Sequence, residues 1–158
     1  MWMFRFAALA AVLSACSSTF YSETEDEVRV TSGVGGFVLS INERYNAWEA
    51  SGKRLVIDGP VASADAFAAF SVPGACYTPN AVFQPHAISH FGIVPNARVT
   101  MHYASYLPPP LRDWFVESPW FHNPVMTPHL GYERLLELWP EGACPSEDDT
   151  RRWLREDR

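Results

Sequence analysis

The sequence predicts an α/β fold with a small parallel sheet, crossover helices and a helical C-terminal part, and three consecutive segments carry this prediction. Residues 54–58 form a short apolar run typical of a buried strand, and residues 81–84 have the same character. Residues 63–70, between them, are small and apolar, which favours a helix that packs closely on its neighbours. A strand, a helix and a strand in this order indicate a parallel crossover.

The segment before these strands adds another strand and another helix. Residues 28–30 are expected to begin a short strand, and the glycine-rich residues 32–36 are expected to turn the chain. Residues 37–50 are predicted to form a helix that ends at residues 51–52, Ser-Gly. Its buried face is expected to hold the apolar residues at three- and four-residue spacing, which are Val38, Ile41, Tyr45 and Trp48.

The C-terminal part is predicted to be mainly helical. A helix over residues 99–106 is halted by three prolines at 108–110, and a second helix is expected to start from these prolines. Residues 119–128 are expected to form an aromatic loop. Residues 131–139 predict a last helix, with leucines on one face and glutamates on the other.

The composition of the 158-residue chain is that of one globular domain, with 47% hydrophobic and 19% charged residues. The formal net charge of −6 leaves no basic excess to neutralise phosphates, so nucleic-acid binding is not expected. No apolar run reaches the roughly 18 residues of a transmembrane helix. The sequence also has no metal-finger spacing and no glycine-rich phosphate loop, so no metal or cofactor is expected.

The first residues have the organisation of an export signal. A positive charge at Arg5 precedes the apolar residues 6–13, and the motif Leu-Ser-Ala-Cys at 13–16 closely resembles the lipobox of bacterial lipoproteins. The resemblance implies cleavage before Cys16 and acylation of that cysteine, which anchors the protein in the bacterial cell envelope. Because Ser17 stands where inner-membrane retention usually needs Asp, it also implies the outer membrane, facing the periplasm. An ordinary signal peptide followed by a chance cysteine is the alternative.

Use of Cys16 for lipid leaves two cysteines in an oxidising compartment, and we predict a disulfide between Cys76 and Cys144. The chain then divides into four parts, of which one is expected to fold. These parts are a signal peptide at 1–15, an acidic tether at 16–31, the α/β domain at 32–144 and a charged tail at 145–158.

Three features are expected to meet at one edge of the sheet. Ser63 stands at the start of a predicted helix, after the strand at 54–58 and a Gly-Pro break at 59–60, and His86 stands at the end of the next strand. Neighbouring parallel strands bring their carboxyl ends to the same edge, so the histidine is placed to take the proton of the serine. Backbone amides at Gly35 and Gly36 are suited to hold a developing oxyanion. Taken singly, these residues also have ordinary interpretations as a helix cap, a core histidine and a turn.

The order of these pieces resembles the proteolytic subunit of the caseinolytic (Clp) serine proteases, and implies a Clp-protease/crotonase-like fold. The shared order is a glycine pair that opens a helix, a serine after a strand and small residues, and a Pro-Asn-Ala step before a histidine. More closely, the chain is similar to a group of uncharacterised exported bacterial proteins of that fold. The matching motifs are Val-Ile-Asp-Gly-Pro at 56–60, Cys-Tyr-Thr-Pro-Asn-Ala at 76–81 and His-Ala at 86–87, within a resemblance that covers residues 33–144.

Carried over residue by residue, the resemblance implies a serine hydrolase of the peptidase type. Ser63 would be the nucleophile and His86 the general base, and the amides of Gly36 and Ala64 would form the oxyanion hole. The implied reaction is hydrolysis of a peptide or ester through an acyl-enzyme, without a metal. The implied partners are a peptide substrate and the membrane that holds the lipid on Cys16, and the oligomeric state stays open.

The chain also departs from the pattern of that group. Val61 and Asp65 stand where the group has cysteines, and Asp65 repels a developing oxyanion if its carboxylate points inward. Pro85 replaces an aromatic residue and lacks the N–H that a strand pairs through. The third triad member is not identifiable, because Asp113 is a candidate only by its place in the chain and is ordinarily interpreted as a solvated helix residue.

Two hypotheses therefore stand side by side. The first is a serine hydrolase with a Ser–His dyad or triad, which the retained Ser63, His86 and glycine pair favour. The second is a catalytically inactive lipoprotein that uses the same fold as a binding or scaffold module of the cell envelope, which the departures favour. The fold alone does not decide between them, because one fold hosts several functions.

Overall fold

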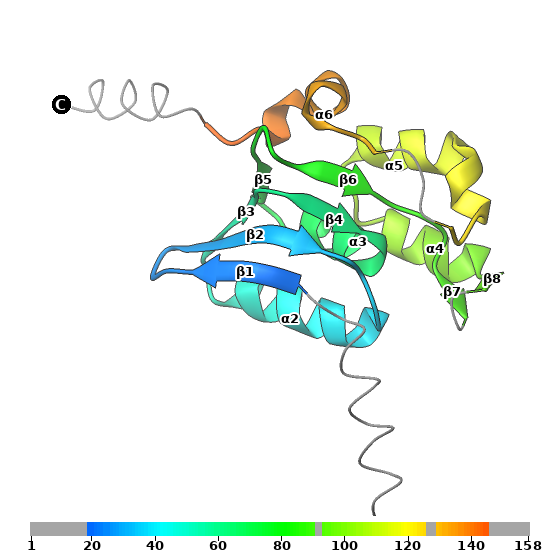
Figure 1. Cartoon of the computed structure of the whole chain (residues 1–158), viewed down its shortest axis with the longest axis horizontal. Helices are drawn as coiled ribbons and strands as arrows, with labels where there is room; N and C mark the ends of the chain where they lie inside the picture. Colours follow the sequence, from blue (N-terminus) through cyan, green and yellow to red (C-terminus); the bar gives the residue numbers. More distant parts are fainter. Residues whose placement is uncertain (1–18, 91–92, 126–128, 146–158) are drawn as a thin grey trace, which may run out of the picture.

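Two strand–helix–strand units form a mostly parallel sheet with helices packed against it, which confirms the predicted α/β class (Figure 1). The computed structural model describes residues 19–90, 93–125 and 129–145. The predicted signal peptide, the predicted lipidation site Cys16 and all but the first residue of the predicted charged tail lie outside the described residues.

The elements follow the order β–β–α–β–β–α–β–β and then a mainly helical part. The strands are β1 (Thr19–Glu23), β2 (Glu27–Gly33), β3 (Arg54–Ile57), β4 (Pro60–Ala62), β5 (Cys76–Tyr77), β6 (Val82–Gln84), β7 (Ser89–His90) and β8 (Val94–Pro95). The helices are α2 (Val38–Ala50), α3 (Ser63–Ser71), α4 (Ala97–Ala104), α5 (Pro109–Glu117) and α6 (Tyr132–Leu138), with 3-10 turns η1 (Pro119–His122) and η2 (Pro140–Gly142).

Strand β2 has a neighbour along each of its edges. β1 pairs with it antiparallel along its length, with Thr19 opposite Gly33. β3 and β4 pair with it parallel, β3 over its first half and β4 at Gly33. Because β1 occupies one edge, β3 and β4 follow one another along the other edge. The link between them passes so close to β2 that a Cβ added to Gly59 would lie 1.9 Å from the Thr31 carbonyl oxygen.

The outer side of β3 and β4 is covered in the same order. β5 pairs parallel with β3, and β6 pairs parallel with β4, with Ala62 opposite Gln84. The C-terminal part adds two isolated bridges on this side, from Leu130 to Phe83 and from Ala143 to Tyr77. The carboxyl ends of β2, β4 and β6 therefore lie at one edge of the sheet, which is called the carboxyl edge below.

The predicted disulfide between Cys76 and Cys144 is present, and it joins positions 68 residues apart in the chain. The two Cα atoms lie 4.8 Å apart. Beside the disulfide, the Cys144 N–H donates a hydrogen bond of 2.9 Å to the Tyr77 carbonyl oxygen. The C-terminal end of the described domain is thus tied to β5.

The segment predicted to be an acidic tether belongs largely to the sheet, which corrects the boundary of the folded domain. From Thr19 onward it forms β1 and most of β2, and Val28 and Val30 are completely buried. Its acidic side chains meet cations: Glu27 pairs with Arg29 and Arg54, and Glu23 pairs with Lys53. The alternation of valines with polar residues suits a strand that is buried on one face.

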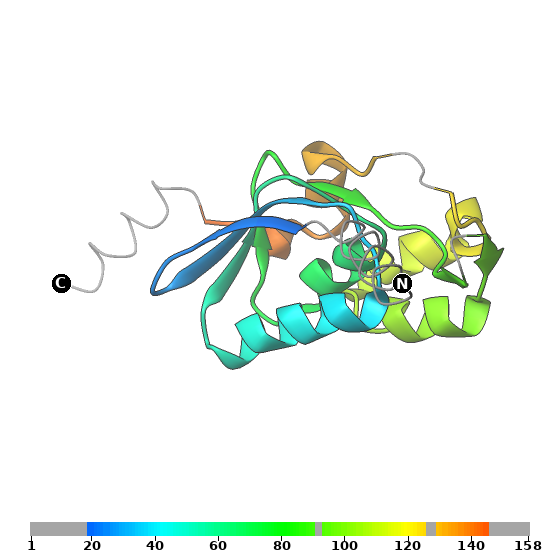
Figure 2. The ribbon, with the colours of Figure 1, turned by 60° about the horizontal axis from the view of Figure 1, so that its bottom comes forward.

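Helices α2 and α3 pack against the same side of the sheet and against each other (Figure 2). In α2, Ile41, Tyr45 and Trp48 form the buried stripe that the spacing predicts, while Val38 is half-buried. Helix α3 is buried almost all round, as its small residues allow. Burial of these two helices fixes the ends of the strands that precede them.

The C-terminal part is helical, as predicted. Helix α4 starts earlier than expected because the side chain of Asn96 caps it, accepting a hydrogen bond of 3.1 Å from the Val99 N–H. The prolines open α5, and part of the expected aromatic loop forms η1. Among the described residues, no helix has the length and apolar character needed to cross a membrane.

Candidate functional site

Ser63 and His86 both lie at the carboxyl edge, on neighbouring strands. Ser63 directly follows β4, and His86 comes two residues after β6. Since Ala62 pairs with Gln84 in parallel register, the two candidates follow paired strand ends, Ser63 one residue and His86 two residues beyond the pair. Both side chains are half-buried. Parallel α/β sheets bind their ligands at this edge.

The backbone of Ser63 is held in the left-handed region, with φ of +55°. Among the described residues it is the only non-glycine residue with positive φ. An L-residue in this conformation costs about 1–3 kcal/mol and persists only where its surroundings fix it, as at functional sites. Ser63 is not the cap of α3, because Ala62 holds that position and the helix has no side-chain cap bond.

Residues 34–36, called the glycine loop below, follow β2 and pack directly on Ser63. Gly35 has φ of +81°, and a Cβ added to it would lie 2.4 Å from Ser63 Cβ and 2.9 Å from Ser63 Oγ. A glycine is therefore required here both for its backbone conformation and for the close approach. This contact places the next residue, Gly36, in the predicted oxyanion loop beside the candidate nucleophile.

The loop is held in place by Asp65, whose side chain is completely buried. Asp65 Oδ2 accepts a hydrogen bond of 2.9 Å from the Gly35 N–H. Its Oδ1 accepts one of 2.8 Å from the Thr19 hydroxyl and one of 3.1 Å from the Tyr45 hydroxyl. Arg44 in turn donates to the Thr19 hydroxyl. One carboxylate thus links β1, the glycine loop, α2 and α3.

These partners orient the side chain of Asp65 toward β1, the glycine loop and α2. Both of its oxygens accept hydrogen bonds from donors on β1, the glycine loop and α2, and its Cβ and Cγ pack against Gly33. Burial, followed by the neighbouring carboxylate of Asp65, raises the pKa of Tyr45 well above its ordinary value, so the tyrosine remains a donor at neutral pH. The sequence pattern did not identify Thr19 or Tyr45 as part of this arrangement, because their partner lies 46 and 20 residues away.

Two backbone amides are suited to hold an oxyanion beside Ser63. The Ala64 N–H belongs to the first turn of α3, where an α-helix leaves its amides without internal acceptors. The Gly36 N–H has no acceptor among the described residues. The Gly35 N–H is already used by Asp65, so the predicted pair of Gly36 and Ala64 is the available one.

The Ala87 carbonyl orients the ring of His86. Its Nδ1 lies 3.0 Å from the Ala87 carbonyl oxygen, which only accepts, so Nδ1 carries the proton and Nε2 is left as an acceptor. Ala87 is itself fixed, because its N–H donates to the carbonyls of Trp120 and Asn123. Burial lowers the pKa of His86, against an opposing effect of the Ala87 carbonyl, and favours the neutral ring.

The structure also shows the surroundings of Pro85 and Asp113, the two other residues at which the chain departs from the pattern or lacks a clear role. Pro85 follows the last residue of β6, so its missing N–H leaves the pairing of β6 with β4 intact. Asp113 is exposed and pairs with Arg112 at 2.8 Å. Among the described residues, no carboxylate accepts a hydrogen bond from His86. The His86 ring hydrogen-bonds only to the Ala87 carbonyl among the described residues, so no hydrogen bond joins it to Ser63 in this structure.

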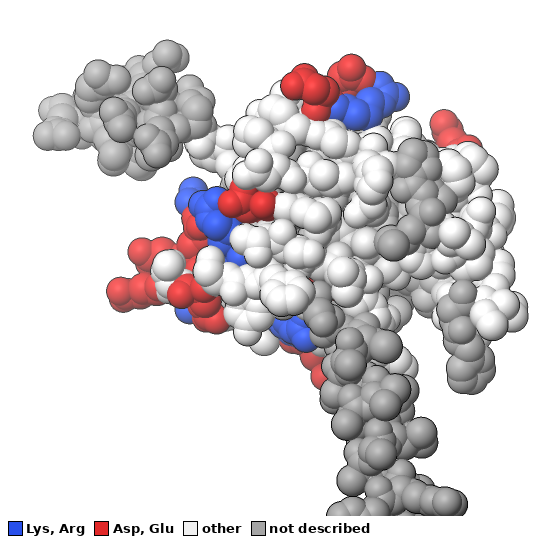
Figure 3. All heavy atoms as spheres, viewed as in Figure 1, with Lys and Arg blue, Asp and Glu red and all other residues white. Residues whose placement is uncertain are grey.

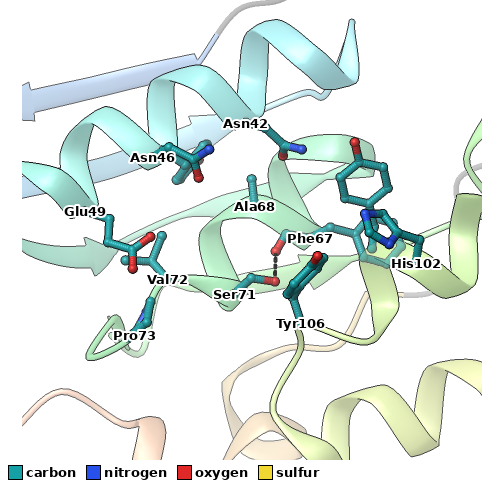
Figure 4. A pocket seen from close by; sticks show the side chains of 12 residues that line it. Asn42, Asn46, Glu49, Phe67, Ala68, Ser71, Val72, Pro73, His102 and Tyr106 are labelled. Atoms are coloured by element: carbon teal, nitrogen blue, oxygen red, sulfur yellow. Dashed lines mark hydrogen bonds between the residues drawn. The ribbon is translucent and has the colours of Figure 1, made fainter.

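A separate cavity of about 450 Å³ lies on the helical side of the domain (Figure 4). Asn42, Asn46 and Glu49 project into it from α2, His102 and Tyr106 from the opposite wall, and α3 forms the floor between them. Ser63, Gly36 and His86 do not line it. Its walls combine amides, a carboxylate and aromatic rings, which suits a polar ligand with an apolar face.

Within the described ranges, no cluster of histidine, cysteine, aspartate or glutamate has the makings of a metal site. Comparison of the chain with protein-family models, with curated proteins and with solved structures gives no match.

Proposed function

We propose that the protein is a lipid-anchored serine hydrolase of the bacterial cell envelope, with a Clp-protease/crotonase-like fold and a Ser63–His86 dyad. The left-handed backbone of Ser63 carries this proposal, because it is a strained serine at the carboxyl edge of a parallel sheet. The neighbouring glycine loop and a histidine with a free Nε2 supply the other two requirements of acyl transfer.

The proposed reaction proceeds through an acyl-enzyme. His86 Nε2 takes the proton of Ser63 while Oγ attacks the carbonyl carbon of a peptide or ester. The amides of Gly36 and Ala64 hold the resulting oxyanion, and His86 returns the proton to the leaving amine or alcohol. Water, deprotonated by the same nitrogen, then releases the acid and restores the serine. No metal or cofactor takes part in the proposed steps.

The proposed location is the periplasmic face of the outer membrane, with acyl chains on Cys16. The order of positive charge, apolar run and lipobox supports it. The Cys76–Cys144 disulfide agrees with an oxidising compartment. Replacement of Cys16 by serine is expected to release the protein from membranes, and membrane retention of that variant would contradict the anchor.

Labelling with a fluorophosphonate probe tests the dyad. The wild-type protein is expected to be labelled, and Ser63→Ala and His86→Ala are expected to lose the label. Ser105→Ala is the matched control, because the hydroxyl of Ser105 lies on an exposed helix end and bonds only the His102 carbonyl among the described residues. Equal labelling of wild type and Ser63→Ala would refute the nucleophile.

A non-catalytic binding module is the second candidate, and the cavity between α2, α3 and α4 favours it. The cavity is distinct from the Ser63 site and needs no nucleophile. Incorporation of a photoreactive amino acid at Tyr106, which lines the cavity and is 57% exposed, tests this role in intact cells. Two results together would favour the binding module over the hydrolase. The folded wild-type protein would not be labelled by the fluorophosphonate, and the variant with the photoreactive amino acid at position 106 would form a crosslink.

A further inference from the structure

The first described residue lies against the candidate active site. Thr19 pairs with Gly33 at the carboxyl end of β2, and its hydroxyl donates to Asp65, two residues after Ser63. Any constraint on the chain just before Thr19 therefore acts on the position of the carboxyl edge.

The proposed lipid attachment is such a constraint. Cys16 precedes Thr19 by three residues, and a fully extended chain of that length spans about 11 Å at most. An acylated cysteine sits at the surface of the bilayer, because its acyl chains are buried among the lipid tails. The carboxyl edge is consequently held close to the membrane, whatever path these residues take.

Exposed apolar side chains stand on both sides of this edge. Val34 and Phe37, in and after the glycine loop, are 55% and 68% exposed, and Ile93 and Val94, at the β7–β8 hairpin, are 75% and 59% exposed. Figures 1 and 2 both place the start of α2 and the β7–β8 hairpin on the side to which β2, β4 and β6 point. Exposed apolar residues mark a contact site where they gather, and here two such pairs flank one edge of the sheet.

Many charged side chains gather away from this edge. In Figure 3 they cover the β1–β2 turn and α6, whereas the visible surface over β6 is almost free of them. Two cations stand near the carboxyl edge itself: Arg98 is exposed in α4, and Arg44 hydrogen-bonds to Thr19. The β1–β2 turn carries Glu25 and Asp26, both exposed. An edge with few charged groups approaches lipid at a lower desolvation cost than the acidic turn, and a long cationic side chain such as Arg98 keeps its charge in the polar headgroup region.

We propose that the carboxyl edge rests on the bilayer surface, with Val34, Phe37, Ile93 and Val94 in the headgroup region, and that the Ser63 site acts on acyl or peptidyl groups presented at that surface. This orientation rests on the proposed lipid anchor and on the proposed function of the site. The contact is apolar, so it does not require anionic lipids. Substrates that diffuse in the periplasm are, in this arrangement, poorer than substrates held by the membrane.

Photocrosslinking of the full-length lipidated protein in its membrane tests the orientation. A benzophenone amino acid replaces Phe37 or Ile93, and in the matched control it replaces Glu25, which lies at the far end of β2, about 20 Å away. All three positions are exposed, so the fold tolerates the change. Lipid adducts, counted by mass spectrometry, are expected to be about five-fold or more abundant at positions 37 and 93.

A second variant distinguishes the effect of the short link to Cys16 from the effect of the apolar side chains. A flexible spacer of about 20 Gly and Ser residues between Cys16 and Thr19 has a root-mean-square length of about 25 Å and relaxes the constraint. Lipid adducts at position 37 are expected to fall several-fold in this variant while the protein stays membrane-bound.

The outcomes distinguish this inference from the hydrolase proposal. Membrane-bound protein with equally few adducts at positions 37, 93 and 25 overturns the orientation and leaves fluorophosphonate labelling of Ser63 as it was. Protein that is absent from the membrane overturns the anchor and the orientation together. Loss of labelling with strong adducts at 37 and 93 overturns the catalytic part and keeps the surface contact.

Discussion

The buried carboxylate of Asp65 accepts a hydrogen bond of 2.9 Å from the backbone N–H of Gly35. This bond joins the glycine loop to α3 at the point where the loop touches Ser63. An aspartate that by sequence alone threatens the oxyanion instead holds the loop that would bind it. The shape of the candidate site therefore depends on Asp65, which acts through the glycine loop and not through contact with a substrate.

Replacement of Asp65 by alanine is expected to destabilise the domain by about 2–4 kcal/mol, since it leaves the buried Gly35 N–H and Tyr45 hydroxyl without acceptors. Urea unfolding monitored by tryptophan fluorescence measures this loss. Asp113→Ala is the matched control, because its side chain is 60% exposed, and its effect is expected to stay below about 0.5 kcal/mol. Similar effects of the two substitutions would show that the Asp65 network does not support the fold.

Replacement of Gly35 by alanine is expected to disrupt the site as well as the fold, because the new Cβ would lie 2.4 Å from Ser63 Cβ. Gly52→Ala separates the two effects: its φ of +71° is similar, but no atom lies within 4 Å of the added Cβ. The control is expected to lose about 1 kcal/mol from backbone strain alone. Gly35→Ala should lose more in urea unfolding, and equal losses would contradict the contact with Ser63.

Ser63→Gly is expected to be more stable than Ser63→Ala by about 1 kcal/mol, because glycine relieves the left-handed backbone and alanine keeps it. The backbone of Ser105 is helical, with φ of −66°, so Ser105→Ala is expected to be more stable than Ser105→Gly. Thermal or urea unfolding of the four variants measures both differences. The same order at both positions would argue against strain at Ser63.

His86 is expected to titrate below its ordinary pKa of 6.5, because burial favours the neutral ring. Hydrolysis needs that neutral ring, so kcat/KM is expected to rise with pH through the folded pKa of His86 and to be level at neutral pH. Proton NMR of the imidazole resonances, assigned with His86→Ala, reads the pKa directly. An inflection above 6.5 in the titration would overturn the assignment.

Removal of the disulfide by the double substitution Cys76→Ala and Cys144→Ala is expected to cost up to about 4 kcal/mol, because a long loop gains freedom in the unfolded chain. Urea unfolding measures the loss. Dithiothreitol should lower the stability of the wild type and leave the double variant unchanged. A wild type that is insensitive to the reductant, with two reactive thiols at these positions, would contradict the bond.

Local patterns predicted the elements that depend on near neighbours in the sequence. The spacing of Ile41, Tyr45 and Trp48 identified α2 and its buried face, and the apolar run before Ser63 identified β3. The strand–helix–strand order predicted residues 54–58 and 81–84 as neighbouring strands, and this pairing is wrong: β3 pairs with β5. The neighbour of β6 is the short strand β4, which the sequence suggested was a Gly-Pro break, and β4 and β6 bring Ser63 and His86 to one edge.

The rest depends on contacts between distant residues. A run of acidic residues before Val28 resembles a solvated tether, and only its pairing with Arg54 and Lys53 makes it part of a sheet. The strained backbone of Ser63 leaves no mark in the sequence, because a non-glycine residue is held there by its surroundings. The orientation of Asp65 likewise follows from donors on three other segments.

The bridges of Leu130 and Ala143 to β6 and β5 have a consequence for the behaviour of the protein among other proteins. An open strand edge offers its unpaired amides to any extended chain, which is a common route to aggregation. Here the two bridges, together with the disulfide at Cys144, cover that outer edge with the protein's own last segment. A chain cut after residue 129 would keep the Ser63 edge but expose β5 and β6, and it is expected to associate with itself.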